Sequence, residues 1–304
     1  MPSLETSKLK VRPGHVREEE IAGVDVLYME PAAEDGADRT TTATVKGILF
    51  VAHGCSHSKT DWFLGCDDCI GLPEERAIVA LGLERNLLVV AISSSNRDSK
   101  CWNHAVDGPR IAKVLEALAA RYNNAPVIAF GASSGGAFVS ILGKYFRSLY
   151  SFISQIAAQH APTDTSVKTA IYITMNRDKR TEERAQHYVE THKDPVPRVK
   201  HLRLPPLHIG DTFFSDRIIE VSTDQSKAMV QALREESMLT SEGLLSEDPR
   251  RTDWRYVLRP HVDAEQDSLI ADQSPISEVM NVAYGNHELA RDSVGEALDF
   301  CLSP

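Results

Sequence analysis

Short apolar runs alternate with amphipathic stretches along most of the chain. Five of these runs are rich in β-branched residues and lie between glycines or polar clusters: 24–29, 46–52, 87–92, 127–130 and 171–174. Near-continuous apolar runs of this length are typical of strands buried on both faces of a parallel sheet. A further strand is expected over about 199–204.

Helical patterns lie between the strands. A helix is predicted to begin at Pro73, because proline suits the first helical turn and the two glutamates that follow favour the positive end of the helix dipole. Apolar residues at helical spacing predict a second helix over 107–122, and further helices are expected over 137–146 and 292–302. Strands alternating with helices predict a doubly wound, mostly parallel α/β sheet with helices on both faces.

Residues 205–283 interrupt this alternation. The segment holds an amphipathic helix over 226–236, followed by polar sequence around SEDPRRTDW. A stretch of this length inside a compact domain usually has its own structure and often a binding role. We therefore expect a single domain over 1–304 with a cap-like insertion, a lid, at about 205–283. Candidate residues to line a pocket beneath this lid, which core packing explains equally well, are Phe213, Phe214, Trp254 and Tyr256.

Composition and charge exclude several classes of protein. Of the 304 residues, 42% are hydrophobic, which is enough to build a sizeable core. The formal net charge of −10 argues against a nucleic-acid partner and against an anionic membrane surface. No apolar run approaches the roughly 18 residues that span a bilayer. The first residues also lack the apolar stretch of a secretory signal, so we expect a cytoplasmic protein.

The chain has five cysteines, and their use bears on compartment and metal binding. An odd number without a signal predicts reduced thiols in the cytoplasm. Cys66 and Cys69 have the spacing of half a zinc site or of a redox motif, but no second pair completes a tetrahedral site. We interpret them as structural thiols and expect no metal. Neither a phosphate-binding loop nor a dinucleotide fingerprint is present, so we also expect no cofactor.

The most specific motif is Gly131-Ala132-Ser133-Ser134-Gly135, between the strand PVIAF and the helix GAFVSILGKYF. A serine at the tip of a strand-to-helix turn adopts a strained backbone that presents its hydroxyl above the sheet, and its neighbours two residues away must be small. Glycines stand at both of those positions. The alternative interpretation is a Gly/Ser-rich turn that only connects two elements.

This strand–turn–helix resembles the nucleophile turn of the α/β-hydrolase superfamily, and the resemblance extends from about residue 45 to the end. The sequence His53-Gly54-Cys55-Ser56, which follows the strand GILFVA, is similar to the His-Gly turn of that family. The resemblance implies that the backbone N–H of Cys55 or Ser56 forms an oxyanion hole with that of Ser134. Each such donor contributes about 3 kcal/mol to transition-state binding. We interpret His53 and His57 as residues that hold this loop together.

A serine nucleophile needs a base and an orienting carboxylate, and the family order is Ser, acid, His. Asp178 follows the strand over 170–174, which resembles the family's acid-bearing turn. Asp211 and Asp216 are rival acids, and the alternative role for Asp178 is a solvated pair with a neighbouring Lys or Arg.

For the base, His287 lies in Gly285-Asn286-His287-Glu288, just before the last predicted helix, which resembles the family's histidine turn. His208 is the rival, because it closely follows the last predicted strand. With His287 as the base, residues 205–283 are an insertion between that strand and the histidine.

These motifs predict a serine hydrolase that cleaves a small-molecule carboxylic ester, or an amide or thioester as second choices, through an acyl-enzyme on Ser133. His287 would move the proton and Asp178 would orient the imidazole. A hydrolase-fold receptor with slow or no turnover, a same-fold acyltransferase, lyase or C–C bond hydrolase, and a scaffold are the alternatives. The natural substrate and the oligomeric state are not encoded in these motifs.

Overall fold

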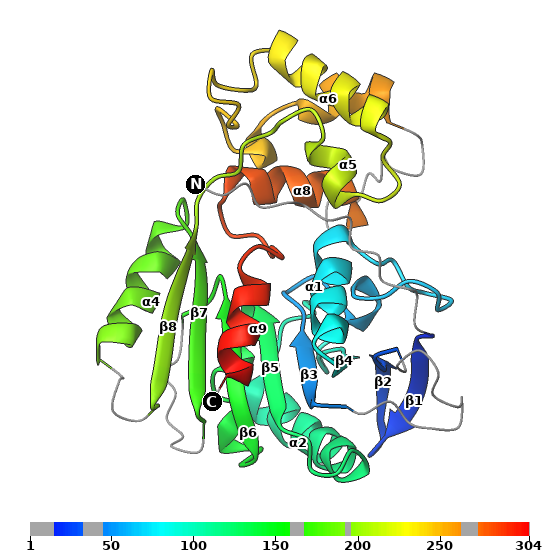
Figure 1. Ribbon diagram of the computed structural model, residues 1–304, viewed down its shortest axis with the longest axis vertical. Coiled ribbons are helices and arrows are strands. Elements are labelled where there is room, and N and C mark those ends of the chain that lie inside the picture. Colours follow the sequence, from blue (N-terminus) through cyan, green and yellow to red (C-terminus); the bar gives the residue numbers. More distant parts are fainter. Residues whose placement is uncertain (1–14, 33–44, 159–166, 192–195, 263–272, 304) are drawn as a thin grey trace.

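A computed structural model describes residues 15–32, 45–158, 167–191, 196–262 and 273–303 (Figure 1). Its centre is an eight-stranded sheet of order β1-β2-β4-β3-β5-β6-β7-β8. The strands are β1 (Arg17–Ile21), β2 (Val24–Met29), β3 (Gly47–Ala52), β4 (Leu87–Ile92), β5 (Val127–Ala132), β6 (Leu149–Gln155), β7 (Thr169–Met175) and β8 (Arg198–Leu204). β2 pairs antiparallel with β1 and β4, and all other pairs are parallel, which confirms the predicted mostly parallel sheet.

Burial explains the strand order. Every residue of β3, β4 and β5 is buried, so these apolar strands occupy the middle of the sheet. β1, with sequence REEEI, lies at the edge and leaves its charged side chains largely in solvent. Charged side chains on an edge strand discourage pairing with a second molecule.

Helices cover both faces, as predicted. One hydrophobic cluster joins the sheet to residues of α2 (His104–Arg121), α3 (Ser134–Val139) and α4 (Lys179–Thr191). A second cluster joins the opposite face to α1 (Pro73–Glu84) and α9 (Val294–Leu302). The helix predicted over 137–146 differs: α3 is short and is followed by a single 3₁₀ turn over Leu142–Lys144.

The segment over 205–283, called here the inserted segment, lies between β8 and His287. It contains α5 (Phe213–Arg217), α6 (Thr223–Glu235), α7 (Trp254–Leu258) and most of α8 (Pro275–Tyr284). These helices bury a third hydrophobic cluster of their own, and Figure 1 shows α5, α6 and α8 together beyond one end of the sheet. Phe213, Phe214 and Trp254 are buried in this cluster, whereas Tyr256 is 83% exposed. Packing within the segment therefore explains three of the four aromatics.

The expectation of reduced thiols is wrong for four of the five cysteines. Cys55 is joined to Cys101 and Cys66 to Cys69 by disulfides, and only Cys301, buried in α9, is free. Each pair comes together in loops that precede α1 or α2, which the count of cysteines alone does not reveal. The interpretation of Cys66 and Cys69 as a structural pair of thiols is corrected to a short disulfide-closed turn.

The described residues include neither a membrane-spanning helix nor a metal-binding cluster. No helix there is both long and apolar enough to cross a membrane. Within the same part of the chain, no three His, Cys, Asp or Glu side chains gather in a way that would hold a metal ion.

Candidate active site

Ser133 occupies the tight turn between β5 and α3. Its backbone has φ 52° and ψ −115°, a conformation that costs a non-glycine residue on the order of 1–3 kcal/mol. The surrounding structure holds this turn. The Ser133 N–H donates to the Gln155 carbonyl at 3.0 Å, and the Ser133 carbonyl accepts from the Ala137 N–H at 2.9 Å. A strained serine anchored at both backbone groups is suited to present its hydroxyl in one direction.

The two flanking glycines are required by close backbone approach. A Cβ at Gly131 would overlap the main chain of Gly135, and a Cβ at Gly135 would overlap the carbonyl oxygens of Ala52 and His53. The turn therefore packs directly on the end of β3. Gly54 differs, because a Cβ there would meet Ser133 Cβ at 3.9 Å, an ordinary contact.

The structure brings Ser133, His287 and Asp178 into one hydrogen-bonded chain. Ser133 Oγ lies 3.1 Å from His287 Nε2, and His287 Nδ1 lies 2.7 Å from Asp178 Oδ2. A carboxylate only accepts hydrogen bonds, so Nδ1 carries the proton and Nε2 accepts from the serine hydroxyl. The Asp178 side chain is 11% exposed, whereas that of His287 is 49% exposed.

Asp178 is fixed by the start of α4. Its Oδ1 accepts from the Thr181 N–H at 3.2 Å, so the same carboxylate caps the helix and faces His287. Burial raises the pKa of Asp178, but the hydrogen bonds from His287 and Thr181 outweigh it and hold this pKa below its ordinary value. The carboxyl is thus ionised at neutral pH, as an orienting partner for an imidazole must be.

The rival residues lie elsewhere. His208 lies against Gly243 within the inserted segment. Asp211 pairs with Arg234 at 3.0 Å, and Asp216 accepts a hydrogen bond from the Thr212 hydroxyl at 2.7 Å.

Two ties hold the loops of the site in register. The Arg177 N–H donates to the Gly285 carbonyl at 3.1 Å, joining the turn after β7 to the turn of His287. Gln155, buried at the end of β6, donates from Nε2 to the Ala290 carbonyl at 2.7 Å and accepts from the Ala290 N–H at 3.1 Å. Because the Gln155 carbonyl also accepts from Ser133, one residue connects the serine turn to the histidine loop.

The loop after β3 is organised around a buried, neutral histidine. His53 Nδ1 donates to the Gly54 carbonyl at 2.6 Å, and its Nε2 accepts from the Ser94 N–H at 3.0 Å. Burial lowers the pKa of His53 to about 4, so the ring stays neutral and can fill both roles. This arrangement agrees with the interpretation of His53 as a loop-holding residue.

The candidate oxyanion donors are not equivalent. The Ser56 N–H donates to the Ser99 carbonyl at 3.2 Å and is therefore already engaged. Among the described residues, no acceptor pairs with the N–H of Cys55 or of Ser134. Of the two alternatives in this loop, Cys55 is therefore the one whose N–H has no acceptor among the described residues.

A neighbouring loop, residues 99–102, holds the loop after β3 (residues 53–57), which is called here the oxyanion loop after the role expected of it from the sequence. The Cys55–Cys101 disulfide joins the two covalently. Lys100 Nζ donates to the Ser56 carbonyl at 3.1 Å, and Trp102 Nε1 donates to the His53 carbonyl at 2.9 Å. Four consecutive residues thus hold the backbone on which Cys55 lies.

His57 completes the loop with a charged contact. Its Nδ1 lies 2.9 Å from Asp61 Oδ2. Burial alone would lower the pKa of His57, but the bond to Asp61 and the nearby Glu75 carboxyl raise it to about 9. His57 is therefore a cation at neutral pH, with a structural ion pair at the base of the loop.

Comparisons with known proteins concern the fold. No protein-family model matches the chain, and neither does any curated protein. Among solved structures, an esterase of Pyrococcus furiosus is similar at 12% identity and a TM-score of 0.47, with 67% of this chain and 86% of that chain covered. An α/β serine hydrolase without lid from Xanthomonas campestris has 14% identity and a TM-score of 0.41, with coverage of 79% and 98%. A fluorophosphonate-binding serine hydrolase of Staphylococcus aureus has 11% identity and a TM-score of 0.44, with coverage of 63% and 91%.

The chain's own sheet and its serine turn carry the assignment of the fold. β5, the strained Ser133 and α3 form the strand–turn–helix that presents a nucleophile in this superfamily. Its fold is that of the α/β hydrolases. Fold alone does not settle chemistry, which depends on the residues of the site.

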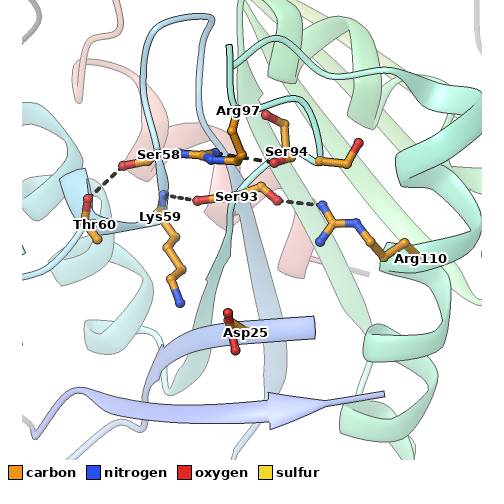
Figure 2. Close-up of a pocket in the computed structure, with 9 residues that line it drawn as sticks. Asp25, Ser58, Lys59, Thr60, Ser93, Ser94, Arg97 and Arg110 are labelled. Carbon is orange, nitrogen blue, oxygen red and sulfur yellow. Dashed lines mark hydrogen bonds between the residues drawn. The ribbon is translucent and has the colours of Figure 1, made fainter. Parts of the chain in front are cut away.

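A polar cavity of about 410 Å³ lies beside the oxyanion loop (Figure 2). Its lining residues are Asp25, Ser58, Lys59, Thr60, Ser93, Ser94, Ser95, Arg97 and Arg110. Two of its cations are neutralised, because Lys59 pairs with Glu18 at 3.0 Å and Arg110 with Asp107 at 2.8 Å. None of these residues belongs to the Ser133–His287–Asp178 chain.

Sequence reasoning missed the residues that support the site from a distance. No motif surrounds Gln155, which lies at the end of a strand that the apolar pattern does not predict. The sequence around Arg250 indicates only a polar loop, although the residue contacts the turn of His287. The one available signal was a glutamine within the apolar sequence FISQIAA, where a buried amide must find partners.

Proposed function

We propose that the protein is a serine hydrolase that cleaves carboxylic esters through an acyl-enzyme on Ser133. The observation that supports this proposal best is the hydrogen-bonded chain from Ser133 Oγ through His287 to Asp178. A serine hydroxyl is a weak nucleophile near neutral pH, and this chain supplies the base and the orienting carboxylate that it needs.

The reaction proceeds in two halves. Ser133 Oγ attacks the ester carbonyl carbon while His287 Nε2 takes the hydroxyl proton, and the tetrahedral intermediate collapses when that proton passes to the leaving alcohol. A water molecule then attacks the acyl-enzyme, again giving its proton to Nε2. The carboxylic acid leaves, and the proton returns to Ser133. Asp178 accepts the Nδ1–H bond throughout and stabilises the imidazolium.

The N–H groups of Cys55 and Ser134 would bind the oxyanion of both tetrahedral intermediates. Both donors are rigid, because Ser134 begins α3 and Cys55 is covalently tied to Cys101. Preorganised donors of this kind need no rearrangement when charge develops on the oxygen. The half-exposed His287 supports water as the acceptor, since solvent can reach the face of the base.

Activity on a panel of p-nitrophenyl esters of increasing acyl length tests the proposal, together with labelling by a fluorophosphonate probe. We expect the wild type to hydrolyse short esters and to be labelled, and Ser133→Ala to lose both. Ser215→Ala is the matched control, because this serine lies in α5 and its hydroxyl only donates to the Thr212 carbonyl. Equal labelling of the wild type and Ser133→Ala would refute the proposal.

A further inference from the structure

Arg250, from the inserted segment, contacts three successive residues of the turn that bears His287. Its Nη1 donates to the Asn286 carbonyl at 2.9 Å, and its Nη2 donates to the His287 carbonyl at 3.1 Å and to Glu288 Oε2 at 3.0 Å. Arg250 lies in a 3₁₀ turn over Pro249–Arg251, 37 residues before His287. A planar guanidinium presents its donors in a rigid fork that fits several fixed acceptors at once, whereas a lysine ammonium is a compact group on a flexible stem.

The turn itself needs such support. His287 has φ 48°, in the left-handed region that a side chain with a Cβ rarely adopts, and it closely follows the left-handed Gly285 at the end of α8. Such a conformation costs on the order of 1–3 kcal/mol and persists only where neighbours over-determine it. The carbonyls on which Arg250 acts are those of the strained residue and of the residue before it.

The residues that Arg250 contacts are themselves held in place. Glu288 is held by Asn281 Nδ2 at 2.9 Å and by the Leu289 N–H at 3.2 Å, so it links the turn to α8. Asp248, which accepts from the Arg250 N–H at 3.0 Å, caps the 3₁₀ turn. Arg250 is thus tied at its backbone and at its side chain.

The inserted segment is also anchored to the body of the protein. Arg217 in α5, nearly buried, pairs with Glu74 of α1 at 2.7 Å and with Asp292, just before α9, at 2.8 Å. Because Arg217 ties the segment to α1 and to the residues just before α9, Arg250 reaches the turn from a fixed base.

We infer that Arg250 is a positioning residue for the base: it holds the backbone of His287 so that Nε2 faces Ser133 and Nδ1 faces Asp178. This inference rests on the proposed function. It gives the inserted segment a part in catalysis, since a residue of that segment orients the imidazole. A displacement of about 1 Å at a reacting group can cost about 10²-fold in rate.

Steady-state kinetics of Arg250→Gln on a p-nitrophenyl ester test the inference, with Arg251→Gln as the matched control. Arg251 is the next residue, is exposed and belongs to the same 3₁₀ turn. We expect Arg250→Gln to lower kcat by about 10- to 100-fold while KM changes less than about twofold, because a residue that acts through the backbone of the base affects the reaction step more than ester binding. Arg251→Gln should behave as the wild type, and Arg250→Lys should not restore kcat.

Rescue separates positioning from general destabilisation. We expect methylguanidinium to restore part of the kcat of Arg250→Ala and none of that of Ser133→Ala. If Arg250→Gln is poorly folded by circular dichroism, Arg250→Lys, which keeps the charge and the stem, gives the answer in its place.

The outcomes are distinguishable. A folded Arg250→Gln or Arg250→Lys with the wild-type kcat, beside an inactive Ser133→Ala, overturns the inference and leaves the proposed function standing. A Ser133→Ala variant as active as the wild type overturns the proposed function instead.

Discussion

Removal of the Cys55–Cys101 disulfide should weaken both the fold and the reaction. The double variant Cys55→Ala/Cys101→Ala deletes the bond without leaving a free thiol and keeps the backbone N–H of residue 55. The disulfide closes a loop with a sequence separation of 46 residues and joins the oxyanion loop to the loop at 99–102. The matched control is Cys66→Ala/Cys69→Ala, which deletes a disulfide with a separation of only 3 residues.

The expected loss in the free energy of unfolding follows from the entropy of loop closure. In the chain-entropy relation, a cross-link over 46 residues restricts the unfolded chain by about 4 kcal/mol at 25 °C, and one over 3 residues by about 1.6 kcal/mol. Loss of the first disulfide should therefore lower the free energy of unfolding by about 2.4 kcal/mol more than loss of the second. Against a total of about 5–15 kcal/mol for a typical protein, this difference is readily measured.

The effect on catalysis has an upper bound. Complete loss of one oxyanion donor costs about 10²- to 10³-fold in kcat. The hydrogen bonds of Ser56, Lys100 and Trp102 remain after the disulfide is removed and still restrain the loop. We therefore expect a fall in kcat of about 10-fold, and no change in kcat for the control variant.

Urea unfolding of both double variants measures the stability, and hydrolysis of a p-nitrophenyl ester measures kcat. Wild-type enzyme reduced by a phosphine should fall in kcat as the Cys55→Ala/Cys101→Ala variant does. The reasoning is refuted if the two double variants lose equal stability and both keep the kcat of the wild type.

Three further predictions follow from the contacts around the site. Gly135→Ala should destabilise the fold by about 1–3 kcal/mol, because its Cβ would overlap two carbonyl oxygens at the end of β3, and a melting temperature equal to that of the wild type would contradict this. Gln155→Leu should cost about 1–3 kcal/mol in urea unfolding for each of the two Ala290 backbone groups that it leaves unpaired, and a loss below about 1 kcal/mol in total would count against it. The folded-state pKa of His57, about 9, lies above its unfolded value of 6.5, so its bond to Asp61 stabilises the fold fully below about pH 6.5 and is lost as pH rises through 9. The stability advantage of the wild type over His57→Gln should therefore shrink by about 3 kcal/mol between pH 6 and pH 10, and a constant difference would show that the ion pair does not form.

Some elements were out of reach of the pattern of apolar residues. β6 was not predicted, because its sequence LYSFISQ mixes apolar residues with Ser151, Ser154 and Gln155, all of which are buried in the structure. α4, with sequence KRTEERAQHYVET, is mostly polar, since it covers an end of the sheet with few apolar side chains. A buried polar strand and a solvated helix both obscure the periodicity on which sequence reasoning depends.

The serine turn could be found from the sequence because its parts are contiguous. A strand, a glycine-flanked serine and a helix follow one another within about 20 residues, and steric demands within that stretch dictate small neighbours. The order of Ser133, Asp178 and His287 along the chain likewise matches the order Ser, acid, His of the family that the sequence resembles. Which acid and which base lie beside the serine was not, because 154 residues separate Ser133 from His287 and 109 separate His287 from Asp178.

The class of fold, the mostly parallel sheet and the turn of Ser133 could therefore be predicted from the amino acids alone, since local sterics and periodicity act between residues close in the chain. Contacts between segments that are distant along the chain could not be predicted in this way. Folding pairs Cys55 with Cys101, leaves the Cys55 N–H without an acceptor among the described residues while engaging that of Ser56, and brings Arg250 onto the turn of His287. These contacts depend on how the loops and the inserted segment pack around the ends of the strands, and no local pattern encodes that packing.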